Sequence, residues 1–167
     1  MSIPHAGEKL LLDTQRSQRI WWSAVAVIVL LASVDLLFAS SYWHFTYALP
    51  PTRLAQNIAA GLLGKRAFAG GMNTVLLGLL LHYAMMSVMV GVYYLLSRQF
   101  AGLREHPWRY GSLYGVVLYV VMNEIVLPLS AAPKTPFILS WILSSIVMHW
   151  IIGVAIAHSA RRAWGND

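Results

Sequence analysis

The sequence predicts an all-α integral membrane bundle of four transmembrane helices plus one outer interfacial amphipathic helix. Three observations support this fold class. Of the 167 residues, 58% are hydrophobic and only 11% are charged; the apolar residues gather into four long runs; and aromatic side chains flank those runs. Soluble domains carry about 25% charged residues. A soluble core of this size could not hide so much apolar surface, so we expect a membrane protein.

The four apolar runs cover residues 20–40, 73–96, 110–129 and 137–157. Each is close to the ~20 residues that a helix needs to cross the hydrocarbon core of a bilayer. The first run exceeds the ~7–15 apolar residues of a signal peptide and contains Asp35, so we interpret it as a transmembrane helix. No long polar segment separates the runs. We therefore predict a single transmembrane domain over residues 1–167.

The segment between the first two runs is too long for a hairpin turn and too apolar for a solvated loop. It begins with two prolines, which are typical of a helix start. Large aliphatic residues then recur every four positions from Leu54 to Leu62, and glycines follow at positions 70 and 71. We predict an amphipathic helix over about residues 52–68 that lies in the outer interface or dips into the bundle.

Lysine and arginine are distributed unequally between the two ends of the predicted helices. One end carries eight of them: Lys9, Arg16, Arg19, Arg98, Arg104, Arg109, Arg161 and Arg162. The other end carries four: Arg53, Lys65, Arg66 and Lys134. The positive-inside rule then places both termini in the cytoplasm. These residues form no continuous stripe, so the net charge of +6 indicates contact with membrane lipid and not with nucleic acid.

Each apolar run contains an ionisable residue, and such residues in hydrocarbon usually face a partner or a cavity. At a rise of ~1.5 Å per residue, Asp35, Glu124, His82 and His149 lie roughly 7, 8, 14 and 18 Å inside the outer boundary. Pro128 cannot donate to the backbone carbonyl one turn earlier, so polar backbone and polar side chains coincide there. We predict a polar intramembrane cluster of Asp35, His82, Asn123, Glu124 and His149.

Three interpretations of this cluster stay open. In the first, the side chains are interhelical hydrogen bonds of an accessory or scaffold bundle, each contributing about 0.6 kcal/mol. In the second, Glu124 and His82 exchange protons in a proton-linked small-solute transporter or channel. In the third, His82 and His149 ligate haem in a bis-histidine membrane subunit. The sequence favours the first, with no catalytic residue and no cofactor, because no nucleophile motif occurs.

The absence of cysteine excludes thiolate metal sites and iron–sulfur clusters. Met85, Met86 and Met89 are close together, but methionines on a transmembrane helix are more typical of packing than of copper binding. Haem would find cations for its propionates only at Arg53, Lys65 and Arg66 on the outer side. The sequence thus leaves the presence of a metal at His82 and His149 undecided.

Small residues at a spacing of four predict where helices touch. The candidates for helix packing are Ser87 with Gly91, Gly111 with Gly115, and Gly153, which shares a face with His149. Four helices leave little room for alternating access, so a transporter would work as a homodimer or larger membrane complex. The pair Gly111 and Gly115 is the predicted contact for that homodimer.

Two stretches carry a family resemblance. Residues 58–94 contain AGLLGK, AFAGG and LHY, and residues 114–133 contain the helix end NEIVLPL. With His149, these stretches resemble a group of small bacterial inner-membrane proteins of unknown function that is distantly similar to the YagU type. The resemblance implies a bacterial inner membrane and draws attention to His82, Asn123, Pro128 and His149. It implies no activity, and Glu124 stands where the group would have an apolar or aromatic residue.

Overall fold

The computed structural model describes residues 6–134 and 136–164, which are almost entirely helical and contain no strand. Four of its helical stretches are long and apolar enough to cross a membrane, which confirms the predicted all-α membrane bundle. The elements in order are α1 (Ala6–Tyr47), α2 (Pro51–Leu63), the 3-10 helix η1 (Gly64–Ala69), α3 (Gly71–Gln99), α4 (Gly102–Glu105), α5 (Pro107–Val120), the π-helix η2 (Val121–Val126), α6 (Leu127–Leu129) and α7 (Leu139–Trp164).

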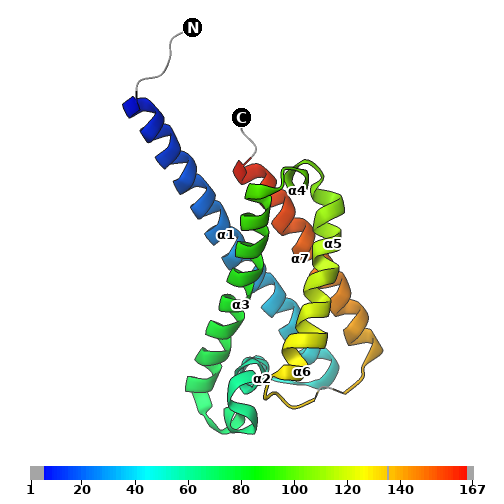
Figure 1. Ribbon diagram of the computed structural model, residues 1–167. Helices are drawn as coiled ribbons and strands as arrows, with labels where there is room; N and C mark the ends of the chain where they lie inside the picture. The colour runs from blue at the N-terminus through cyan, green and yellow to red at the C-terminus, as the bar shows by residue number, and fades with distance from the viewer. Residues whose placement is uncertain (1–5, 135, 165–167) are drawn as a thin grey trace.

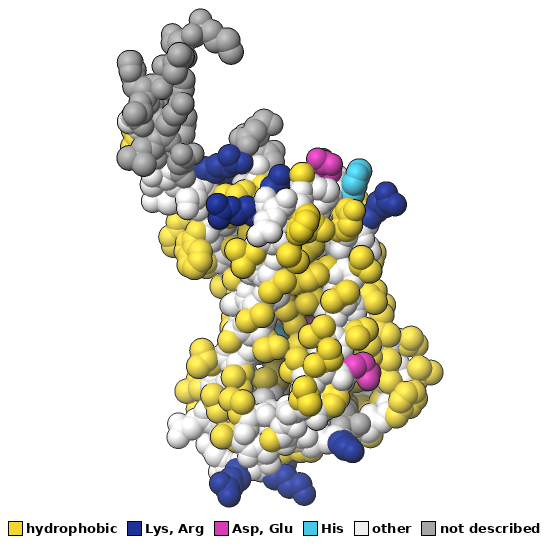
Figure 2. All heavy atoms as spheres, viewed as in Figure 1, with side chains coloured by type: hydrophobic (Ala, Val, Ile, Leu, Met, Phe, Trp, Pro, Cys, Tyr) yellow, Lys and Arg dark blue, Asp and Glu magenta, His cyan; other side chains and the backbone are white. Residues whose placement is uncertain are grey.

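The first helix extends far beyond the apolar run that predicted it. α1 contains 42 residues, which corresponds to about 63 Å of helix and exceeds the ~30 Å hydrocarbon core. Its N-terminal turns project beyond the other helices (Figure 1). The start of α1, the end of α7 and α4 lie at one end of the molecule, and α2 lies at the opposite end. Figure 2 shows Lys and Arg side chains at both ends and a hydrophobic surface between them.

The α4 end of the bundle is held together by tyrosines. Tyr114 of α5 donates its hydroxyl to the Met89 carbonyl of α3 at 2.7 Å, and the rings of Tyr93 and Tyr114 lie 5.0 Å apart. Tyr94 shares a hydrogen bond of 2.7 Å with Ser159 of α7. Toward the α2 end, α3 and α5 diverge (Figure 1). The two halves of the bundle therefore differ: one is closed by hydrogen bonds and the other is splayed.

α5 and α7 approach closely through glycine. A Cβ added at Gly115 would lie 2.5 Å from the His149 carbonyl oxygen and 2.6 Å from the Trp150 Cα. A Cβ at Gly111 would lie 2.8 Å from the α7 backbone, and one at Gly153 would meet the backbone of α5. The structure thus places these three predicted packing residues within one chain. Gly111 and Gly115 are not free to form the homodimer contact that we predicted for them.

The other predicted packing pair, Ser87 and Gly91, makes no such contact. A Cβ added at Gly91 would meet nothing within 4 Å in the part of the chain that the structure describes. Ser87 is exposed and donates its hydroxyl to the Tyr83 carbonyl of its own helix at 2.8 Å. Spacing alone did not distinguish a packed face of a helix from an open one.

The predicted interfacial helix folds onto the splayed end of the bundle. α2 ends at Leu63, because Gly64 adopts a positive φ of 59°, and η1 continues to Ala69. A Cβ at Gly78 of α3 would overlap the Ala55 carbonyl, so α2 lies directly on α3. Gln56 donates to the Gly71 carbonyl at 3.2 Å. α2 therefore packs on the end of the bundle, against α3 and against the segment after α6, where the Ala131 N–H donates to the Gly61 carbonyl at 2.9 Å.

Candidate functional site

A cavity of about 460 Å³ lies between α1, α2, α3, η2, α6 and α7. This volume falls in the range of about 300–1,000 Å³ that is common for small-molecule sites. Four residues of the predicted polar cluster line it: Asp35, His82, Asn123 and His149. The fold thus brings together side chains from four helical segments that are far apart in the sequence.

Glu124, the fifth predicted member, does not line the cavity, and its side chain is exposed. Met122 and Asn123 of the same turn line the cavity, whereas Glu124 does not. The predicted proton exchange between Glu124 and His82 has no support in this arrangement. The acid that lies beside His82 is Asp35.

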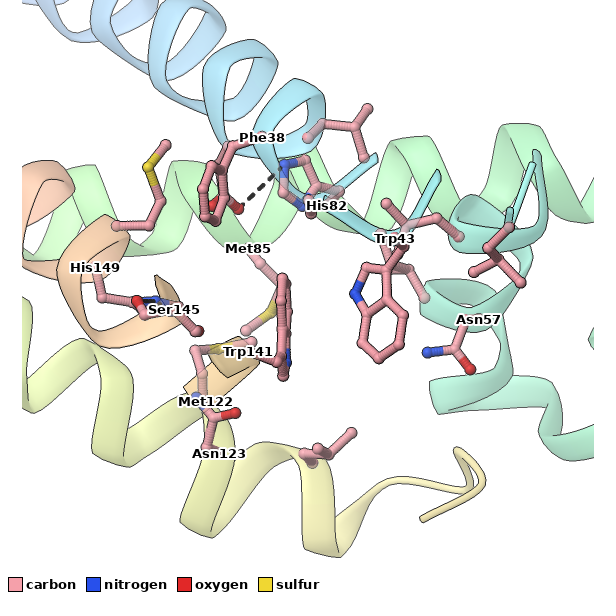
Figure 3. Close-up of a pocket in the computed structure, with 18 of the residues that line it drawn as sticks. Phe38, Trp43, Asn57, His82, Met85, Met122, Asn123, Trp141, Ser145 and His149 are labelled. Atoms are coloured by element: carbon pink, nitrogen blue, oxygen red, sulfur yellow. Dashed lines mark hydrogen bonds and ion pairs between the residues drawn. The ribbon is translucent and has the colours of Figure 1, made fainter. Parts of the chain in front are cut away.

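His82 connects α3 to α1. Its Nε2 lies 2.9 Å from the Ala32 carbonyl oxygen and 3.8 Å from Asp35 Oδ2. A carbonyl oxygen only accepts hydrogen bonds, so Nε2 carries a proton. The side chains of His82 and Asp35 are 15% and 24% exposed, and both residues line the cavity, where Figure 3 shows His82. A haem ligand at this position would have to bind through Nδ1.

His149 and Asn123 are each oriented by the backbone of their own segment. His149 Nδ1 donates to the Ser145 carbonyl at 2.8 Å, and Asn123 Nδ2 donates to the Tyr119 carbonyl at 3.0 Å. The rings of Tyr119 and His149 lie 5.7 Å apart, edge to face. These contacts leave His149 Nε2 and Asn123 Oδ1 without a partner among the described residues, and both residues line the cavity.

The π-helical turn that carries Asn123 has a cause in the sequence. Pro128 has no N–H to donate to the carbonyl four residues earlier, and its ring would crowd that carbonyl. The Leu127 N–H instead donates to the Met122 carbonyl, five residues back. π-Helical turns inside α-helices are frequent at functional sites. We predicted that polar backbone and polar side chains would coincide here, but not that the helix would widen into a π turn.

Aromatic rings and thioethers form the apolar walls. The rings of Trp43 and Trp141 have centroids 5.2 Å apart, and Phe38 stacks on Trp141 at 6.4 Å with an interplanar angle of 17°. Figure 3 shows both indoles among the polar residues of the cavity. Five of the seven methionines also line it: Met85, Met86, Met89, Met122 and Met148. Sequence reasoning treated the first three as simple packing residues and did not identify the other two or Trp141.

Two cations lie at the outer rim of the cavity. Arg53 places its guanidinium carbon 4.1 Å from the centroid of the Phe68 ring, and Lys134 lies on the segment between α6 and α7. Both side chains are exposed. Among the described residues, no three His, Asp or Glu side chains are grouped so that they could hold a metal ion. The cavity therefore has a cationic rim and an interior of aromatic, thioether and hydrogen-bonding groups.

Comparison of the chain with protein-family models, with curated proteins and with solved structures gives no match. The resemblance to the YagU type stays a prediction.

Proposed function

We propose that this chain is a non-enzymatic accessory protein of a bacterial inner membrane that binds one small, mainly apolar molecule in the cavity between its helices. The cavity itself is the observation that supports this proposal. It has the volume of a ligand site, apolar walls, and a few polar groups held in place by backbone hydrogen bonds, which is the usual composition of such sites.

The position of the cavity indicates where the molecule comes from. His82 and Met86 line it from α3, and Met122 and Asn123 line it from η2. These two segments lie on the diverging parts of the bundle, at the level of the hydrophobic surface (Figure 1, Figure 2). We infer that a molecule dissolved in the bilayer reaches the cavity at this level without crossing water. This route favours a lipophilic ligand.

Filling the cavity tests the proposal. Ala39 lines the cavity from α1, so Ala39→Trp should place an indole where the ligand binds. Ala84 of α3 is exposed, so Ala84→Trp adds the same side chain outside the cavity. Native mass spectrometry of protein extracted in mild detergent should show a retained small molecule in the wild type and in Ala84→Trp, and none in Ala39→Trp. A wild-type protein without any retained molecule, or equal retention in Ala39→Trp, would contradict the proposal.

We also propose that both termini face the cytoplasm, since the end of the molecule that contains α4 carries eight of the twelve lysines and arginines. Alkaline phosphatase fused after Arg104 should be inactive, because the enzyme folds only outside the cytoplasm. The same fusion after Lys134 should be active. The opposite pattern would reverse the proposed orientation.

A further inference from the structure

We propose that the cavity binds an aromatic diol of the bilayer, such as a quinol, with its ring against Trp43 and Trp141 and its two hydroxyls donated to His149 and Asn123. This inference rests on the proposed function, because it names the chemical class of the bound molecule. Three properties of the cavity support it: the balance of hydrogen-bond acceptors and donors, the nature of the walls, and the positions of the charges.

Two polar atoms of the interior are free acceptors. His149 uses the proton on Nδ1 for the Ser145 carbonyl, so its Nε2 has a lone pair and accepts. Asn123 uses Nδ2 for the Tyr119 carbonyl, so its Oδ1 also accepts. A ligand that satisfies both atoms must donate. A hydroxyl donates, whereas a ketone or an ether only accepts and would leave these acceptors unpaired.

The walls favour an aromatic ring over a saturated chain. The indoles of Trp43 and Trp141 and the ring of Phe38 offer aromatic faces on which a flat ring can stack. Thioether sulfur makes favourable contacts with aromatic rings, and five methionines surround this space. The two indole N–H groups are donors, and a hydroxyl oxygen can accept from one of them while its proton goes to His149 or Asn123.

The charges favour a neutral ligand. Asp35 is the acid that lines the interior, and it is paired with His82 at 3.8 Å. The cations Arg53 and Lys134 lie at the exposed rim. An anionic group inside the cavity would lie near Asp35 and away from these cations, and burying an unpaired charge is costly. An alkyl or isoprenoid tail on the ring would suit the apolar walls and the surrounding bilayer.

The test compares two probes that differ in one property. Decylhydroquinone donates two hydrogen bonds, whereas its dimethyl ether has nearly the same shape and donates none. Binding of each to the full chain in phosphatidylcholine nanodiscs is measured by isothermal titration calorimetry without oxygen, with empty nanodiscs as the blank. We expect the hydroquinone to bind at least about tenfold more tightly than the ether, because the ether leaves buried acceptors unpaired.

Variants of Asn123 and His149 test whether these two acceptors cause the preference for the hydroquinone over its ether. Asn123→Ala and His149→Ala should each reduce the preference for the hydroquinone to about threefold or less, while binding of the ether persists and shows that the variants are folded. Glu124→Gln is the matched control on the same helical turn and should retain the full preference, since Glu124 lies outside the cavity. Loss of the preference in Glu124→Gln as well would overturn the assignment to these acceptors.

The outcomes separate this inference from the proposed function. Equal affinity of the wild type for both probes overturns the hydroxyl class but leaves the cavity as a ligand site. If neither probe binds but the extracted protein retains another small molecule that Ala39→Trp lacks, the hydroxyl class is also overturned and the proposed function stands. If neither probe binds and no molecule is retained, the inference and the proposed function both fail.

Discussion

Gly153→Ala is expected to lower the free energy of unfolding by about 2–3 kcal/mol, and Gly153→Leu is expected to prevent folding. A Cβ at this position would lie 2.6 Å from the Gly115 Cα and would also contact the Gly111 carbonyl. These are backbone atoms of α5, so they cannot rotate away as a side chain would. α5 would have to move as a whole, which would open its contact with α7 and displace His149 and Trp150 from their positions.

Gly91 supplies the matched control in α3. Gly91→Ala and Gly91→Leu should leave the unfolding free energy within about 1 kcal/mol of the wild type, because surface substitutions usually have small effects and a Cβ there meets nothing within 4 Å. Unfolding in mild detergent followed by circular dichroism measures both series. Equal destabilisation at Gly91 and Gly153 would mean that close approach of α5 and α7 does not control the stability of the bundle.

The membrane spans were predictable because hydrocarbon imposes a strict condition on the sequence: a spanning helix needs about 20 apolar residues in succession. The ends of the helices were not predictable, because a helix can continue beyond the hydrocarbon core into water. α1 includes polar residues such as Arg16 and Arg19 and continues to Tyr47. The next residue, Ala48, takes a positive φ of 52°. Only a conformational break such as this one, or the prolines that follow it, ends the helix.

The polar residues of the site were predictable in part for a similar reason. An ionisable residue in an apolar run is costly unless it has a partner, which marked Asp35, His82 and His149. The run does not reveal which way a residue faces, so Asn123 and Glu124 looked equivalent although only Asn123 lines the cavity. Trp141 and Met148 were missed because an apolar residue on a transmembrane helix looks the same whether it contacts lipid or a ligand.

The contact between α2 and α3 shows a third limit of the sequence. Gly78 allows the Ala55 carbonyl to approach α3, and α2 lines the cavity through Leu54, Asn57 and Ile58. Gly78 and Ala55 are 23 positions apart, and neither belongs to a recognisable motif. Small-residue spacing within one helix predicts a face, but it does not identify the helix that packs on it. The cavity therefore emerged only from the three-dimensional arrangement.

His82→Leu is expected to lower the free energy of unfolding by about 1–3 kcal/mol at pH 8. It removes the Nε2–H that the Ala32 carbonyl accepts, and leaving one partner of a hydrogen bond unsatisfied costs about 1–3 kcal/mol. It also replaces the polar neighbour of Asp35 Oδ2, at 3.8 Å, with an apolar side chain; Asp35 is 24% exposed, and partial access to water limits that effect. Thermal and chemical unfolding in mild detergent measure the loss.

The double variant Asp35→Leu/His82→Leu distinguishes a lost pair from lost packing. If the Asp35 carboxyl left without its polar neighbour causes most of the effect, removing it should return the unfolding free energy to within about 1 kcal/mol of the wild type, because apolar replacement of both partners is often nearly neutral. Purely additive losses in the double variant would show that the two side chains act independently. In that case the 3.8 Å approach of Asp35 to His82 would not be what stabilises the contact between α1 and α3.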